Sequence, residues 1–205
     1  MNSQISSGRN NGSNERGAAL VELALVLSFL ILLVLGIFEV GTAWNTSQGV
    51  TQASRSGARV GSQLAVRGEA DYEILKSIEA SLGDDFGSLT RVVVFESDVS
   101  GEMPVACQTA APGYSGGANC NVYGPTHFAA LATPAGSQWG AGTACGLSDQ
   151  NWCSATERSD GPSITNLTNL GVHVELDKAS VTQLFGSGPI TISESTVMRV
   201  EPGNS

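Results

Sequence analysis

One stretch of the chain has the residue types of a serine-hydrolase nucleophile. Residues 113–117 (GYSGG) have the Gly-x-Ser-x-Gly spacing, and Asp149 or Asp160 and then His173 follow in hydrolase order. That motif needs a buried strand before the serine, whereas residues 110–112 (AAP) lie in a glycine-rich segment between two cysteines. A chymotrypsin-like order is also absent, because no histidine precedes the serine. We therefore expect no catalytic residues and no enzyme activity.

The cysteines indicate disulfides rather than a metal site. All four follow the most apolar stretch of the chain, and an even number in a segment rich in Gly, Ser and Asn is typical of an oxidising compartment. Four cysteines allow three pairings, and we favour Cys107–Cys120 and Cys145–Cys153 because each closes a short loop. No Cys-x-x-Cys pair occurs, and the two histidines stand 46 residues apart. We expect no metal and no other cofactor.

A carboxylate stands at the start of the most apolar stretch. Leu23 to Phe38 is sixteen residues without a charge, preceded by Glu22, and the segment from Ala18 to Ala43 has 26 residues. About 20 helical residues cross a hydrocarbon core of about 30 Å. Placing a carboxylate in or near that hydrocarbon core costs a free energy on the order of a few kcal/mol unless the carboxylate has a partner. If the chain were cut after Gly17, the new α-amino group would lie one helical turn from Glu22, and a neighbouring subunit's amine could equally neutralise it.

This pattern resembles a known family. Gly17 followed by Ala-Ala-Leu-Val-Glu22 resembles a type IV-like prepilin processing site. With residues 36–41 (GIFEVG) and 52–59 (QASRSGAR), it is similar to the TadE-like family of minor pilins or pseudopilins of the tight-adherence pilus system. That family often has an aromatic residue after the glutamate, where this chain has Leu23. Residues 184–186 and 192–202 also resemble the sequences of this family.

The resemblance implies a structural protein. Its partners would be the lipid bilayer, other pilin or pseudopilin subunits, the pilus assembly machinery and a prepilin peptidase cutting between Gly17 and Ala18, with Glu22 in subunit pairing. The alternative is a signal-anchored or secreted extracytoplasmic binding module, cut after Ala43 where residues 41–43 are small. A long, barely basic leader and Glu22 at the entry of the apolar run argue against that alternative.

Charge and the cysteines indicate where the chain resides. The net charge of −9 argues against nucleic-acid binding, which depends on Lys and Arg at phosphates. Arg16 directly before the helix favours a cytoplasmic N-terminus, although Arg55, Arg59 and Arg67 follow it. The disulfides require residues 45–205 to lie outside the cytoplasm. We expect a single-pass protein of the cytoplasmic (inner) membrane, N-terminus inside and head outside, with a cell-surface pilus as a further destination.

The sequence divides into three parts. These are a cytoplasmic leader at 1–17, a transmembrane and extended helix at 18–65, and an extracytoplasmic head at 66–205 with a loop insertion at 97–165, which we expect to form exposed surface. Gly57 and Gly61 form a small-xxx-small pair within a helical stripe of small or apolar residues. The stripe suits packing on the chain's own head or on a neighbouring subunit, and the sequence leaves both open.

The head is predicted to be a small α/β layer of about three strands. Periodicity predicts helices over 70–82 and 178–185, with a short helical piece at 125–132. β-Branched and alternating stretches predict strands over 89–96, 170–176 and 189–200. The expected fold class is α+β: a long N-terminal transmembrane helix continuing into a small extracytoplasmic α/β head with a disulfide-bearing insertion.

Overall fold

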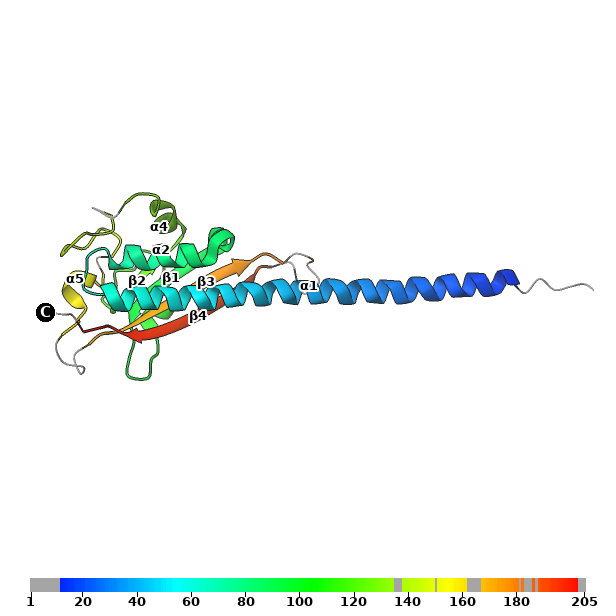
Figure 1. Ribbon diagram of the computed structural model, residues 1–205, viewed down its shortest axis with the longest axis horizontal. Helices are drawn as coiled ribbons and strands as arrows, with labels where there is room; N and C mark the ends of the chain where they lie inside the picture. The colour runs from blue at the N-terminus through cyan, green and yellow to red at the C-terminus, as the bar shows by residue number, and fades with distance from the viewer. Residues whose placement is uncertain are drawn as a thin grey trace, which may run out of the picture.

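A single long helix runs through the whole molecule. The computed structural model describes residues 12–134, 138–149, 151–161, 167–180, 182, 186 and 188–202. Helix α1 (Gly12–Leu64) has 53 residues and is about 80 Å long. Its C-terminal part lies against the head, and its N-terminal part extends beyond the head with none of the described helices or strands beside it (Figure 1). The long N-terminal helix predicted over residues 18–65 is present, but it begins six residues earlier, within the expected leader, and ends at Leu64.

Helix α2 (Ala70–Leu82) returns along α1 and matches the predicted bounds. Asp71 and Glu73 stand in its first turn, where carboxylates interact favourably with the helix dipole. At its end, the Gly83 N–H bonds the carbonyl oxygen of Glu79, and the 3-10 helix η1 (Gly83–Ser88) leads into the sheet. Ala70, Ile74, Leu75, Ile78 and Leu82 are buried. The two helices lie side by side on one face of the sheet (Figure 1).

The sheet has four antiparallel strands in the order β2-β1-β3-β4. They are β1 (Leu89–Glu96), β2 (Cys120–Tyr123), β3 (Asn169–Lys178) and β4 (Ile190–Arg199). The predicted α+β class is confirmed, and β2 is an addition to the three strands expected. Four residues are too few to show an alternating pattern, so β2 is set by its pairing with β1, where Phe95 faces Cys120.

The glycine pair of α1 packs on the chain's own head. A Cβ at Gly57 would lie 3.2 Å from Ile78 Cδ1 and 3.2 Å from Val172 Cγ1. A Cβ at Gly61 would lie 2.7 Å from Leu170 Cδ2 and would also crowd α2. Both glycines therefore let α1 approach α2 and β3 closely. Of the two packing partners that the sequence left open, the structure places the chain's own head against this stripe.

The insertion contributes to the core. It contains α3 (Val105–Gln108), β2, α4 (Pro125–Ala130) and α5 (Ser154–Glu157). Trp139 and Trp152 are completely buried, which differs from the expected exposed loop. Large aromatic side chains bury enough area to hold an irregular segment in place. Disulfides join Cys107 to Cys120 and Cys145 to Cys153, the pairing favoured from the sequence, with Cα–Cα distances of 6.3 and 5.7 Å.

The helix predicted over 178–185 falls mainly outside the described residues. Of its described members, Lys178 is the last residue of β3, and Ala179 and Ser180 have no helical structure. The final strand predicted over 189–200 is confirmed as β4, shorter by one residue at each end.

Candidate functional site at the base of the head

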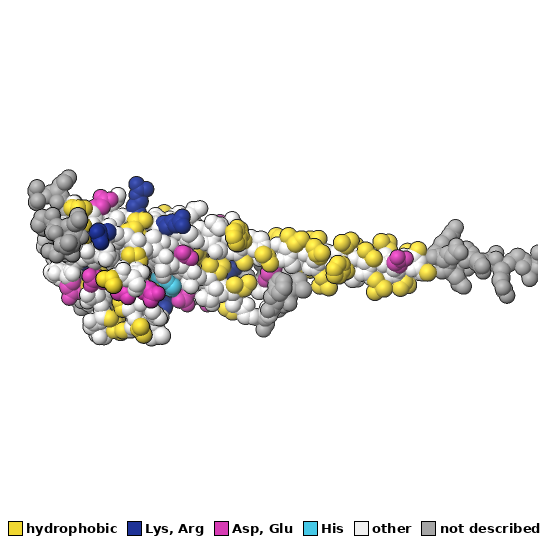
Figure 2. Space-filling view, turned by 90° about the horizontal axis from the view of Figure 1, so that it is seen from below, with side chains coloured by type: hydrophobic (Ala, Val, Ile, Leu, Met, Phe, Trp, Pro, Cys, Tyr) yellow, Lys and Arg dark blue, Asp and Glu magenta, His cyan; other side chains and the backbone are white. Residues whose placement is uncertain are grey.

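The free half of α1 is apolar on all sides. Its large hydrophobic side chains from Leu20 to Phe38 are exposed, and Figure 2 shows them along the face in view. The helix is long and apolar enough to cross a membrane. Exposed aliphatic side chains around a whole helix are stable only in an apolar surrounding. The free half therefore has the properties of a single-pass membrane anchor.

The expected processing and pairing residues lie near the start of this free half. Gly17, Ala18 and Glu22 are all exposed on α1, and a Cβ at Gly17 would meet no atom within 4 Å. Within the described part of the chain, Glu22 has no hydrogen-bond or ion-pair partner. The structure thus leaves the Glu22 carboxylate available to a group from another molecule.

Glu39 marks the point where the head first contacts α1. It is only 3% exposed, and its carboxylate accepts hydrogen bonds from the Ser180 hydroxyl and from the backbone N–H and hydroxyl of Thr182. From Ala18 to Phe38 the helix has 21 residues, about 31 Å, close to the thickness of a hydrocarbon core. Trp44 is 68% exposed one turn later, as expected for an interfacial tryptophan. A membrane crossed by the free half of α1 would therefore have its surface near residues 38–44.

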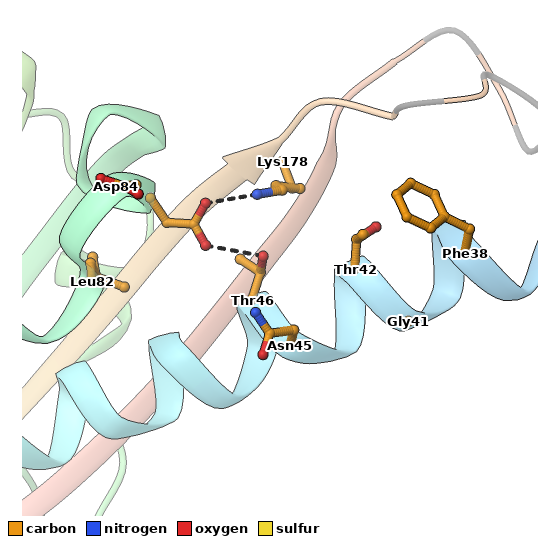
Figure 3. Close-up of a pocket in the computed structure, with 9 residues that line it drawn as sticks. Phe38, Gly41, Thr42, Asn45, Thr46, Leu82, Asp84 and Lys178 are labelled. Atoms are coloured by element: carbon orange, nitrogen blue, oxygen red, sulfur yellow. Dashed lines mark hydrogen bonds and ion pairs between the residues drawn. The ribbon is translucent and has the colours of Figure 1, made fainter.

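A groove opens at this level between α1 and the head, and we call it the junction groove. Its volume is about 750 Å³. Lys178 Nζ lies 2.7 Å from Asp85 Oδ1, and the Thr46 hydroxyl donates to Asp85 Oδ2 at 3.2 Å (Figure 3). The groove is lined by Phe38, Gly41, Thr42, Asn45 and Thr46 of α1, Leu82 of α2, Asp84 and Asp85 of η1, and Lys178 of β3.

A second polar cluster lies buried under the insertion. Arg158 Nη1 is 2.6 Å from Asp71 Oδ1, and both side chains are fully buried. Asn121 Nδ2 and the Tyr123 hydroxyl donate to Asp71 Oδ2 at 2.8 and 2.5 Å. The Arg158 guanidinium stacks on Trp152, 4.2 Å from the ring centroid. This cluster ties α2 to β2 and to the segment after the second disulfide.

Sequence reasoning missed this cluster, although one signal for it was present. Asp71 stands three and four residues before Ile74 and Leu75, so it lies on the buried face of α2. A carboxylate on an apolar helix face needs a buried partner. Nothing in the sequence shows that this partner is Arg158, 87 residues away.

Asp149 is a second carboxylate in the same region. Its side chain is buried, and neither carboxylate oxygen has a hydrogen-bond partner in the described part of the chain. Burial, followed by repulsion from Asp71, raises the pKa of Asp149 to about 7, and Arg158 offsets only part of this. One guanidinium therefore faces two carboxylates.

We predict that Asp149 makes the folded state less stable as the pH rises. Because its pKa of about 7 in the folded state exceeds the ordinary value of 3.8 for an aspartate, the folded state binds more protons than the unfolded state between these two pH values. The free energy of unfolding then falls from about pH 4 to pH 7, by up to about 4 kcal/mol. Urea unfolding of wild type and Asp149→Asn in detergent at pH 4.5, 6 and 8 should give a pH-dependent difference that favours the variant at pH 8.

Asp98→Asn is the matched control for this measurement. A hydrogen bond from the Ser100 hydroxyl lowers the pKa of the exposed Asp98 carboxyl. Replacing Asp98 therefore changes the free energy of unfolding only at acidic pH, and its pH dependence has the opposite sign to that of Asp149. A pH-independent difference between wild type and Asp149→Asn would contradict the role of Asp149.

The hydrolase motif does not assemble into a catalytic site. Residues 109–119 contain no strand, so Ser115 lacks the strand that the motif requires. Asp149 lies in the buried cluster, and His173 contacts Ser195 at 2.8 Å through Nδ1. His173 Nε2 is 3.7 Å from Glu175, too far for the hydrogen bond that orients a triad histidine. Among the described residues, no group of three His, Cys, Asp or Glu could hold a metal ion.

Comparison with known proteins gave one match. Residues 17–59 match the model of a family described as TadE-like protein. The matched segment begins at Gly17 and contains Glu22, the apolar free half of α1, Glu39 and Gly57. No curated protein and no solved structure matched the chain.

Proposed function

We propose that this chain is a structural minor pilin or pseudopilin of a tight-adherence, type IV-like pilus or secretion system. The observation that carries the proposal is the family match over residues 17–59, a segment that contains Gly17, Glu22 and the exposed apolar half of α1. Members of this class act by assembly rather than catalysis. The family match over residues 17–59 supports the coarser statement that the protein is associated with the Tad pilus.

The shape of the molecule supports this function. In the described part of the chain, the head packs on α1 from Glu39 to Leu64, and none of its helices or strands lies beside residues 18–37. A free helix that is apolar on all sides can first reside in lipid and then exchange lipid for the helices of neighbouring subunits. The head is then carried at a fixed distance from the bundle.

The proposed topology places the leader, residues 1–17, in the cytoplasm and the head, residues 66–205, outside it. Both disulfides lie in the head, and disulfides persist in oxidising compartments. In this arrangement the Gly17–Ala18 bond lies on the cytoplasmic side of the inner membrane. A prepilin peptidase would cut it there, and the extended helix from 18 to 65 would remain attached to the head.

The secreted alternative is disfavoured by Glu39. Cleavage after Ala43 would remove Glu39 from the mature chain, together with the hydrogen bonds it accepts from Ser180 and Thr182. Those donors would lose a partner that the buried carboxylate now provides. The head is therefore built to keep the helix rather than to release it.

Cleavage at Gly17 is the test of the proposal. We predict that the mature wild-type chain begins at Ala18 and that Gly17→Leu leaves more than about nine-tenths of the protein uncut. No atom lies within 4 Å of the added Cβ, and Leu is a better helix former than Gly, so the fold should persist. N-terminal sequencing and intact mass measure both outcomes.

Gly41→Leu is the matched control, since Gly41 has equally open space but lies two residues before Ala43. It should not change cleavage at Gly17. If instead the mature chain begins at Trp44 and Gly41→Leu abolishes the cut, the secreted alternative is correct and the pilin proposal is wrong.

A further inference from the structure

We propose that the junction groove binds the headgroup of a phospholipid that carries a primary ammonium, such as phosphatidylethanolamine. This inference rests on the membrane anchoring included in the proposed function, but not on pilus assembly. It assigns a ligand to the described residues that line the groove between α1, η1 and the end of β3.

The groove lies at the depth of lipid headgroups. Its lower end is Phe38, the last residue of the uncharged apolar run, and its upper end is Thr46, eight residues later. Eight residues rise about 12 Å, which covers a headgroup layer of about 5–8 Å and the glycerol region below it. A lipid beside α1 would thus bring its polar end to the groove, with its acyl chains along Phe38 and the free half of the helix.

The groove presents both charges that a zwitterionic headgroup needs. Figure 3 shows Lys178 and Phe38 on the same side of α1, with the Lys178 amine directed toward the Asp85 carboxylate and away from Phe38. Lys178 Nζ has three donor hydrogens and bonds Asp85 Oδ1 at 2.7 Å, which leaves donors for a lipid phosphate. Asp84 lines the groove and is exposed, so its carboxylate can accept hydrogen bonds from an ammonium.

The balance of charge selects among common headgroups. Asp84 and Asp85 against Lys178 give the groove a net charge of −1. An anionic lipid such as phosphatidylglycerol would be repelled. A choline headgroup has the same net charge of zero as phosphatidylethanolamine, but its quaternary ammonium has no N–H to donate. A primary ammonium can pair with the Asp84 carboxylate through charge-assisted hydrogen bonds.

Lipid retention by the full-length protein tests this inference. The chain is reconstituted in vesicles containing equal parts of dioleoyl phosphatidylethanolamine, phosphatidylcholine and phosphatidylglycerol, extracted in mild detergent, and analysed for bound lipid by native mass spectrometry. We expect phosphatidylethanolamine to be retained about tenfold over phosphatidylcholine, the effect of one hydrogen bond to a charged group. Asp84→Asn and Lys178→Gln should each remove most of this preference.

Glu102→Gln is the control, because Glu102 is an exposed carboxylate outside the groove; it should retain the wild-type preference. Equal retention of the three lipids, preferential retention of phosphatidylglycerol, or an unchanged preference in both groove variants would overturn the inference. A lipid-free dimer would also overturn it, since a second copy would then occupy the groove. Failure here leaves the Gly17 result unaffected, and an uncut chain can still retain lipid, so the two proposals fail separately.

Discussion

Replacing Glu22 with glutamine is expected to leave the protein membrane-inserted and cut at Gly17, yet unable to join its partners. After cleavage, the α-amino group of Ala18 carries a positive charge at neutral pH. In an apolar surrounding, a lone ammonium and a lone carboxylate are each poorly solvated, whereas together they form a charge-assisted hydrogen-bonded pair. The exposed Glu22 side chain, without a partner in the described part of the chain, is placed for such a pairing between subunits.

Co-purification of tagged variants with the other pilus components measures this effect, and we expect a loss of at least about tenfold, from the loss of a charged hydrogen bond. Glu102→Gln makes the same chemical change on the head surface and should co-purify as the wild type does. Normal co-purification of Glu22→Gln would rule out the pairing. The carboxylate would then merely extend to the lipid headgroups.

Replacing Arg158 with methionine is expected to lower the free energy of unfolding of the head by about 3–5 kcal/mol, because it leaves the fully buried Asp71 carboxylate without its cation. Methionine keeps a long flexible side chain against Trp152, so little packing is lost. Asp149, in the same region, would add to the uncompensated negative charge near neutral pH. Urea unfolding in detergent, followed by the near-UV signal of the buried tryptophans Trp139 and Trp152, gives the value.

Lys76→Met is the matched control. Lys76 pairs with Glu79 at 2.5 Å on the surface of α2, where the two side chains are 40% and 37% exposed. Exposed pairs of this kind contribute less than about 1 kcal/mol, so this variant should unfold nearly as the wild type does. Equal losses in the two variants would show that Arg158 stabilises the head no more than a surface cation does.

The elements that could be predicted are those whose cause is local. α2 and β1 were predicted to the residue, because a 13-residue amphipathic stripe and an eight-residue β-branched run each indicate one structure. The disulfide pairing was favoured correctly, since short loops close at low entropic cost. β2 was not predicted, because its residues form a strand only when paired with β1. Cleavage after Gly17, pairing through Glu22 and membrane orientation stay predictions.

Some features of the candidate site could likewise be predicted from the sequence, and others could not. By itself, the sequence determined the apolar span, the position of Glu22 and the family resemblance, because hydrophobic length and residue spacing are properties of one continuous segment. Only the tertiary structure decided that Gly57 and Gly61 pack on the chain's own head, that Glu39 anchors Ser180 and Thr182 to α1, and that Asp71 pairs with Arg158. Each of these contacts joins residues far apart in the chain. Their partners are fixed by packing and by the need to satisfy buried polar groups in the folded molecule, and neither leaves a local pattern in the sequence.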